Sequence, residues 1–283
     1  MIRAYVALTK PRIIELLLVT TVPAMVLAER GLPSLWLILA VLFGGTLAAG
    51  GANTLNCYID RDIDDLMKRT HDRPLPAGTI APVNALAFGI TLEVVAFAWL
   101  WSTANLLSAV LAVSATLFYV FVYTLWLKRS TTQNIVIGGA AGAAPVLVGW
   151  AAVTGEVGLP AWIMFAIIFV WTPPHFWALA VRHRDDYAAA GVPMLPVVKG
   201  IPATARQIVA YSFVLVAVTL WLYPAAAMGV PYLASAVVLG ALFIHHAIRL
   251  LRDPTTAARL FTYSITYLGL LFAAIAVDAI AKG

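Results

Sequence analysis

The sequence has few charged side chains for its length of 283 residues. Asp, Glu, Lys and Arg together make up 11% of the chain, 62% of the residues are hydrophobic, and the mean hydropathy is +0.92. A soluble domain of this size requires far more polar surface, so the scarcity of charge excludes one. The composition instead predicts a chain that lies in lipid along its whole length.

Cysteine is almost absent as well. Cys57 is the only one, which excludes an intramolecular disulfide and a metal site built from several cysteines. The N-terminus lacks a cleavage site of small residues, because its first apolar stretch continues past Pro23 to Ala28. We therefore expect this stretch to remain in the protein as its first helix.

Long polar segments are also missing. A bilayer core of about 30 Å requires roughly 20 apolar residues per helix, and apolar runs of that order recur between short charged or Gly/Pro-containing breaks. The sequence therefore predicts an all-α polytopic membrane protein, with one domain over residues 1–283. About nine transmembrane helices are expected, at 13–28, 35–57, 80–101, 105–127, 134–154, 160–180, 208–228, 231–250 and 261–281.

The charges that are present are distributed unevenly among the connections. If nine helices place the termini on opposite sides, only Arg30 and Lys282 of the 18 Lys and Arg residues fall on the side of the C-terminus. Because cytoplasmic connections collect Lys and Arg, we predict a cytoplasmic N-terminus and a periplasmic C-terminus in a bacterial inner membrane. Topology then accounts for the net charge of +5, and no nucleic-acid partner is expected. The two long connections, 60–79 and 182–207, lie on the cytoplasmic side, where we expect the chemistry.

The second predicted span passes into a cluster of carboxylates, Asp60, Asp62, Asp64 and Asp65. Helical spacing of four places Asn56, Asp60 and Asp64 on one face, whereas Asp62 points elsewhere. Carboxylates on one face repel each other, and a hard divalent cation removes this repulsion. Mg²⁺ in particular is usually held by one or two carboxylates while substrate phosphates and water complete its coordination. We therefore predict that Asn56, Asp60 and Asp64 are catalytic residues that bind Mg²⁺ together with a diphosphate.

Three cations, Lys68, Arg69 and Arg73, follow directly after these carboxylates. The planar fork of arginine suits phosphate oxygens, so we predict that the three contact the diphosphate. The alternative is a solvated, salt-bridged loop that serves only as a topology signal. Asn56 favours the functional interpretation, because a polar side chain inside an apolar membrane run is by default a functional candidate.

A second polar segment follows the sixth predicted span. The pair Pro173-Pro174 is expected to break or kink this helix. A helix that resumes at His175 would place residues 175, 179, 182 and 186 on one face. Asp185 and Asp186 could then hold a second metal ion. His175 has an alternative interpretation as a structural hydrogen-bonding residue.

A third group of polar residues lies near the end of the eighth predicted span. It consists of His245, His246, Arg249 and Arg252. These side chains could contact an anionic group. The alternative is that they are ordinary interfacial residues whose polar tips reach water.

At the first two segments the sequence resembles the UbiA superfamily of intramembrane prenyltransferases. The first acidic motif of that superfamily, N-D-x-x-D-x-x-x-D, reads here Asn56-Cys57-Tyr-Ile-Asp60-Arg-Asp-Ile-Asp64, so Cys57 replaces the first Asp. The second motif, D-x-x-x-D, is not kept, because neither Asp185 nor Asp186 has an Asp four residues away. The resemblance implies a helical bundle around a central cavity open to the cytoplasmic side, where Mg²⁺ assists the departure of diphosphate.

Within the superfamily, the haem-farnesylating branch is the most similar. The strings that carry this resemblance are Asn56-Cys-Tyr, Lys68-Arg-Thr-x-x-Arg73-Pro-Leu, Trp171-Thr-Pro-Pro-His-Phe-Trp and Gly191-Val-Pro-Met-Leu-Pro. The resemblance implies that farnesyl diphosphate and haem B (protohaem IX) are the substrates and haem O the product. It makes His175, Arg182 and Arg184 candidates for contact with the haem, and Lys199 a candidate for contact with the diphosphate or with a haem propionate.

Three alternative functions stay open. A UbiA-type enzyme could prenylate an aromatic acid or a quinone precursor, although the string around His175 argues against this acceptor. A membrane transporter could also carry intramembrane polar residues and a broken helix, but here the acids gather at the cytoplasmic ends. An oxidase assembly factor would not require the stripe of Asn56, Asp60 and Asp64. Besides membrane lipid, we expect association with haem A synthase or with oxidase assembly.

Overall fold

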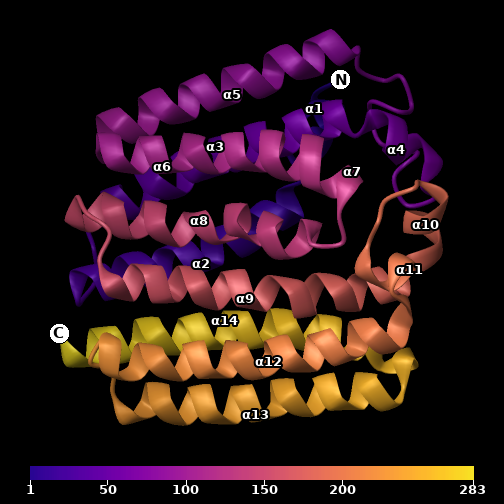
Figure 1. Ribbon diagram of the computed structural model, residues 1–283. Helices are drawn as coiled ribbons and strands as arrows, with labels where there is room; N and C mark the ends of the chain where they lie inside the picture. Colours follow the sequence, from indigo (N-terminus) through magenta and orange to yellow (C-terminus); the bar gives the residue numbers. More distant parts are fainter.

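The computed structural model describes the whole chain apart from the side chains of residues 12, 13 and 15–18. Long helices run roughly side by side and form the body of the molecule, and short helices gather at one end (Figure 1). The long helices are α2 (Pro11–Glu29), α3 (Leu35–Ile59), α5 (Pro82–Thr103), α6 (Leu106–Leu117), α8 (Asn134–Thr154), α9 (Leu159–Arg182), α12 (Gly200–Ala225), α13 (Val230–Arg252) and α14 (Ala257–Lys282). The short elements are α1 (Ile2–Thr9), α4 (Arg61–Leu66), the π-helix η1 (Phe118–Leu127), α7 (Lys128–Ser130), α10 (Arg184–Ala189), α11 (Leu195–Val198) and the 3₁₀ turn η2 (Pro254–Thr256).

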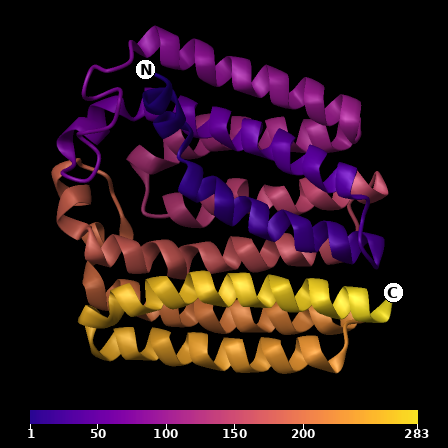
Figure 2. The same ribbon diagram turned by 180° about the vertical axis from the view of Figure 1, so that it is seen from behind.

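The helices agree with the predicted membrane spans. Each predicted span overlaps one long helix, if α6 is taken together with η1 and α7, which continue it. Among the described residues, eight helices are long and apolar enough to cross a membrane, and α2 contributes a shorter apolar helix, Val19–Glu29. The prediction of an all-α polytopic membrane protein is therefore confirmed. The two termini lie at opposite ends of the bundle (Figures 1 and 2).

The prediction of where the seventh span begins is wrong. Helix α12 begins at Gly200 rather than near residue 208. In its first turns Thr204 and Ala205 are buried while Arg206 is exposed, so this part is an amphipathic extension that a search for apolar runs overlooks. The expected long connection 182–207 is consequently largely helical, because it also contains α10 and α11.

Helix α9 runs without interruption through Pro173 and Pro174, so the pair does not break the helix, and the alternative expectation of a kink stays a prediction. Proline removes a backbone donor, but membrane helices tolerate it where neighbouring elements pack closely. Both prolines are buried, and the indole of Trp171 beside them donates a hydrogen bond of 2.8 Å to the carbonyl of Ser264 in α14. Helix α9 is therefore packed against α14 in the region of the two prolines.

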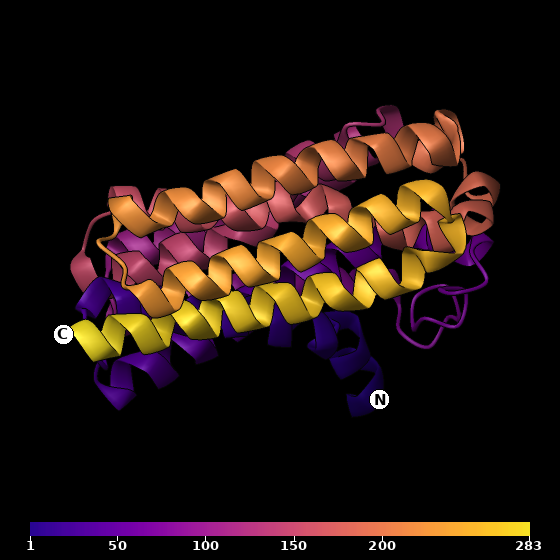
Figure 3. The same cartoon turned by 90° about the horizontal axis from the view of Figure 1, so that it is seen from below.

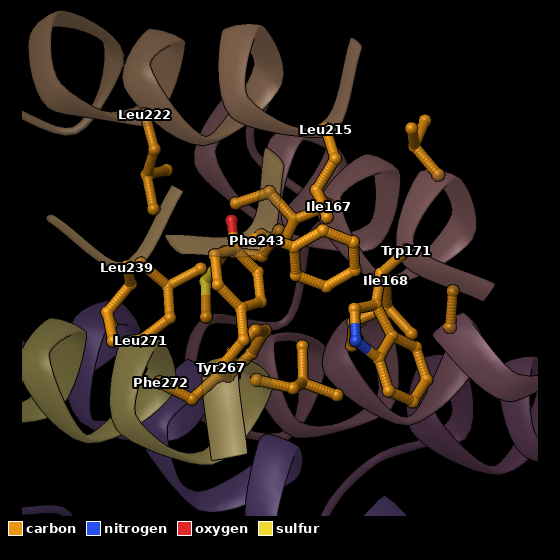
Figure 4. Close-up of a cluster of buried hydrophobic side chains, with 14 of the residues drawn as sticks. Ile167, Ile168, Trp171, Leu215, Leu222, Leu239, Phe243, Tyr267, Leu271 and Phe272 are labelled. Atoms are coloured by element: carbon orange, nitrogen blue, oxygen red, sulfur yellow. The ribbon is translucent and has the colours of Figure 1, made fainter. Parts of the chain in front are cut away.

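The most buried spanning helices are α8 and α9, with 67% and 72% of their apolar windows buried, against 22% in α5. One side of α9 meets a cluster of large side chains from α12, α13 and α14, among them Phe243 and Tyr267 (Figure 4). The rings of these two residues meet edge to face with centroids 5.0 Å apart. The hydroxyl of Tyr267 also pairs with that of Thr219 at 2.8 Å. In lipid, such close packing and interhelical hydrogen bonds hold helices together.

Helices α3 and α5 approach closely along a seam of glycines, as expected for membrane helices. A Cβ atom on Gly44 would lie 2.6 Å from a side-chain carbon of Leu100, and one on Gly51 would lie 2.6 Å from Oε1 of Glu93. A larger residue at either position would therefore displace the side chain of Leu100 or Glu93. The seam fixes α3, which carries the acidic residues at its end.

A buried carboxylate closes the end of the bundle that is remote from the acidic residues. Asp278 of α14 accepts hydrogen bonds from the backbone N–H of Gly229 at 2.6 Å and from that of Tyr232 at 3.4 Å. Both N–H groups belong to the start of α13, where a helix leaves its donors unsatisfied. Asp278 therefore caps α13 from a neighbouring helix.

Substitution Asp278→Ala is expected to lower the free energy of unfolding by about 1–3 kcal/mol, because it leaves buried backbone donors without an acceptor. Asp278→Asn keeps one acceptor oxygen and is expected to lower the free energy of unfolding by a smaller amount. Asp253→Asn is the control, because Asp253 is exposed and accepts hydrogen bonds from Thr255 in its own turn. The unfolding midpoint in detergent micelles measures the three effects, and equal losses in all three variants would contradict this account.

Candidate active site

The acidic segment at the end of α3 divides into a buried face and an exposed face. The side chains of Asp60 and Asp64 are each 1% exposed, whereas that of Asp62 is 60% exposed. The predicted separation of Asp62 from the other two is therefore confirmed. Two carboxylates buried this deeply require partners, because an unpaired buried charge is costly.

Asn56 lies at the centre of the buried face. Its Nδ2 donates to Oδ2 of Asp60 at 2.8 Å and to the hydroxyl of Thr124 in η1 at 3.1 Å. Its Oδ1 accepts a hydrogen bond of 2.7 Å from the Nζ of Lys10. One amide thus connects an acid, a hydroxyl and a cation that come from three separate parts of the chain.

Lys10 is a site residue that the sequence interpretation missed, because it was counted only among the charges that set topology. It lies between α1 and α2 with φ at +53°, a left-handed conformation that redirects the chain. The side chain of Asn53 holds this junction by donating to the carbonyl of Thr9 at 2.9 Å. Burial lowers the pKa of Lys10, and the nearby cations of Arg73 and Lys128 lower it further.

Lys128 is the second site residue that was missed, and it forms an ion pair with Oδ2 of Asp60. It directly follows η1, in which backbone bonds span five residues instead of four. Within η1 the hydroxyl of Thr124 donates to the carbonyl of Tyr119, five residues earlier, at 2.8 Å. The wider turn changes which residues face α3, so periodicity of the sequence gives no sign that Thr124 and Lys128 belong to the site.

Arg73 is the predicted diphosphate contact that reaches the buried acids. Its Nη1 lies 2.7 Å from Oδ2 of Asp64, and its side chain is 28% exposed. The loop that carries it is held by Thr70, whose hydroxyl donates to the backbone carbonyl of Asp64 at 2.7 Å. Lys68 and Arg69 are exposed instead, and the guanidinium carbon of Arg69 lies 6.0 Å from the ring centre of Tyr187.

One buried oxygen of the site has no hydrogen-bond partner among the described residues, namely Oδ1 of Asp60. Nη2 of Arg129 lies 3.7 Å from it, beyond hydrogen-bond distance. Arg129 instead donates two hydrogen bonds of 2.7 Å to Asp62, and this pairing lowers the pKa of Asp62 to about 2. A buried anionic oxygen without a donor is the kind of atom that a metal ion would complete.

The protein ligands by themselves do not form a full metal site. Within the part of the chain whose side chains are described, no group of three or more His, Cys, Asp or Glu residues is arranged to hold a metal. Asn56, Asp60 and Asp64 supply one amide and two carboxylates. This donor set fits Mg²⁺, which typically takes its remaining ligands from phosphate and water.

The second predicted segment packs directly against the acidic segment. Tyr187 of α10 and Met194 share a buried apolar cluster with Ile63 and Met67. Leu8, Cys57, Leu75 and Ile80 form another buried apolar cluster, which contains the residue next to Asn56 in the sequence. Buried apolar side chains of both clusters therefore accompany the acidic segment.

The candidate residues of the second segment differ in their exposure. Asp186 is partly buried, and its carboxylate lies 3.9 Å from Nδ1 of His183. Asp185, Arg182, Arg184 and Lys199 are exposed. The roles of these residues in metal, haem or diphosphate binding stay predictions.

The expected stripe from His175 to Asp186 is interrupted, because α9 ends at Arg182 and a new helix begins at Arg184. The ring of His175 is buried between Trp171 and Phe261, with centroid distances of 4.2 and 4.7 Å. Its Nδ1 lies 2.6 Å from the hydroxyl of Ser264, which itself donates to the carbonyl of Phe261 at 2.6 Å. A proton on Nδ1 would satisfy both contacts of this hydroxyl and would leave the lone pair on Nε2.

Buried acids and cations thus lie together at one end of an apolar helical bundle. The chain belongs to the UbiA prenyltransferase family, which it matches over residues 17–276. A protoheme IX farnesyltransferase of Frankia alni is 59% identical over 284 residues, which cover 99% of this chain and 98% of that protein. A protoheme IX farnesyltransferase of Gloeobacter violaceus is 58% identical over 279 residues, which cover 98% of this chain and 92% of that protein.

Solved structures support the same fold. A digeranylgeranylglyceryl phosphate synthase superposes with a TM-score of 0.81 at 20% identity, covering 99% of both chains. A UbiA homologue from Archaeoglobus fulgidus bound to GPP and Mg²⁺ gives a TM-score of 0.69 at 17% identity, covering 96% of this chain and 99% of that one. At these identities the likeness establishes the fold.

The ion pair between Lys128 and Asp60 can be tested without any substrate. Lys128→Met is expected to lower the free energy of unfolding by about 3–5 kcal/mol, because it leaves a buried carboxylate without its main partner. Adding Asp60→Asn to this variant removes the unpaired charge and is expected to recover much of the lost free energy of unfolding. Unfolding midpoints of the two single variants and the double variant measure the coupling, and strictly additive effects would contradict the pairing.

Proposed function

We propose that this chain transfers the farnesyl group of farnesyl diphosphate to a vinyl group of haem B, which yields haem O. The observation that carries the proposal is the buried cluster at the end of α3, in which two acids and an amide face three cations. The names of the full-length relatives support haem B as the acceptor. The cluster supports a diphosphate as the leaving group.

Asn56, Asp60 and Asp64 would hold Mg²⁺, which when bound neutralises charge on the diphosphate. The orphaned Oδ1 of Asp60 supports this assignment, and a solved family member is described as bound to GPP and Mg²⁺. Lys10, Lys128 and Arg73 would then turn from the acids to the phosphate oxygens. Preorganised cations of this kind stabilise the charge that develops as a leaving group departs.

The reaction balances with water as the third reactant. The bond between C1 of the farnesyl chain and the diphosphate oxygen breaks, and its electron pair leaves with the diphosphate. The vinyl π electrons of haem B form the new carbon–carbon bond to the allylic cation. Water then adds to the remaining cationic carbon and loses a proton, which leaves a hydroxyethylfarnesyl side chain. The apolar clusters that accompany the acidic segment protect the allylic cation from earlier attack by water.

The haem contacts form the second part of the proposal. Arg182 and Arg184, exposed beyond the end of α9, suit the propionates of haem. Lys199 and Arg69 would extend the basic surface at the diphosphate, together with Lys68. For His175 a lone pair on Nε2 is compatible with contact to the porphyrin, and Asp186 rather than the exposed Asp185 is the stronger candidate for a second metal ligand.

The distribution of Lys and Arg supports an orientation with the acidic cluster at the cytoplasmic face and the C-terminus in the periplasm. The bundle end that carries the cluster also carries the N-terminus. A bacterial inner membrane fits this arrangement. Association with haem A synthase or with oxidase assembly stays a prediction.

Asp60→Asn and Asp64→Asn are each expected to lower turnover by about a hundredfold or more, because each removes a charge that positions the metal and the diphosphate. Asp62→Asn is the matched control, since it removes the same charge from the exposed face. Membranes that contain each variant are incubated with haem B, farnesyl diphosphate and Mg²⁺, and haem O is measured by mass spectrometry.

Two results would contradict the proposal. An equal loss of turnover in Asp62→Asn and Asp60→Asn would show that the buried face of the acidic segment has no special role in catalysis. Absence of haem O from the unchanged protein, with prenylation of an added phenolic acid, would assign it to the aromatic branch of the family.

A further inference from the structure

Helices α13 and α14 lie at one edge of the molecule (Figures 1 and 3), and residues of both line a shallow groove near the bundle end that carries the acidic cluster. Its volume is about 470 Å³. The residues that line it are His246 of α13 and Ala258, Arg259, Thr262, Tyr263 and Thr266 of α14. The proposed reaction uses none of them.

Positive charge lies in this groove and next to it. Arg259 lines the groove on α14, and on α13 Arg249 lies one turn after the lining residue His246. Arg249, Arg252, Arg259 and His245 are all exposed. None of these cations forms an ion pair with an acid among the described residues. The only carboxylate between the two helices in sequence, Asp253, is exposed and accepts its hydrogen bonds from Thr255.

These cations differ from those of the acidic cluster. Lys128 and Arg73 each pair with a buried carboxylate of the protein. Arg249 and Arg259 form no close ion pair of this kind among the described residues, although the exposed carboxylate of Asp253 acts on both electrostatically. Three arginines, Arg249, Arg252 and Arg259, against this carboxylate leave an excess of positive charge beside the groove. A ligand with an anionic group would balance it.

The groove changes from charged to apolar along α14. Arg259 is followed one turn later by Thr262 and Tyr263 and after a second turn by Thr266, which share one face of the helix. Beyond the groove, Leu242, Ile265 and Leu270 are 43%, 39% and 52% exposed and face outward from the bundle. Tyr263 is held in place, because its hydroxyl donates to the carbonyl of Leu239 at 2.9 Å and its ring lies 4.7 Å from that of His246.

We propose that this groove binds an anionic glycerophospholipid, with its phosphate between Arg249 and Arg259 and an acyl chain along Thr266 toward Leu270. A phosphate diester with two acyl chains matches both the excess charge at one end and the apolar surface at the other. Basic pockets between transmembrane helices commonly bind anionic headgroups in this way. The guanidinium fork of arginine also suits phosphate oxygens better than a point charge does.

The test compares retention of two lipids by the purified full-length protein. Native mass spectrometry counts lipids that stay bound after exchange into mixed micelles with equal amounts of dioleoyl phosphatidylglycerol and dioleoyl phosphatidylcholine. The unchanged protein is expected to retain phosphatidylglycerol preferentially. Each of Arg249→Gln and Arg259→Gln is expected to lower this retention about fivefold, because each removes one cation at the phosphate.

The control is the double variant R3Q/R206Q, which removes two exposed cations outside the groove. It is expected to keep the preference, whereas R249Q/R259Q is expected to lose it. An equal preference in all three proteins would overturn the proposal, because the cations would then act only as general surface charge. Release of phosphatidylglycerol by added haem B would also overturn it, since the groove would then bind the carboxylates of the acceptor.

Discussion

Burial of two carboxylates at the end of a membrane helix is the constraint on which the active site depends. Asp60 and Asp64 have almost no exposed surface, and a buried charge without a partner would cost several kcal/mol. Each of them therefore forms an ion pair with a cation from elsewhere in the chain. Asp60 pairs with Lys128, and Asp64 pairs with Arg73. With Lys10 at Asn56, these contacts connect the junction of α1 and α2, the end of η1 and the loop after α4.

The same contacts leave the site ready for a ligand. The cations pair with protein acids, and one oxygen of Asp60 has no hydrogen-bond donor among the described residues. A metal ion with a diphosphate would satisfy that oxygen and give the cations a second anion to bind. The packed helices α8 and α9 and the glycine seam of α3 keep the protein ligands in position. Charge balance thus accounts for the pairing of the buried acids with cations and for the proposed binding of a metal ion and a diphosphate.

The candidate site was predictable where its residues lie close together in the sequence. Asn56, Asp60 and Asp64 follow a helical spacing, so their common face and the separate direction of Asp62 could be inferred from periodicity. Lys10 and Lys128 could not be found in this way. Both lie at the membrane boundary, where most cations serve topology, and nothing in the neighbouring residues distinguishes a cation that turns inward from one that faces water.

The sequence by itself determined the class of the protein, because apolar runs of bilayer length can only become membrane helices and a spacing of four can only share one helical face. Only the tertiary structure decided which cations pair with the buried acids. The left-handed turn at Lys10 and the π-helix before Lys128 redirect these side chains by local geometry that is stabilised through contacts with α3. Helix α9 likewise contacts α14, which is far away in the sequence, through Trp171 beside the proline pair and through the buried His175.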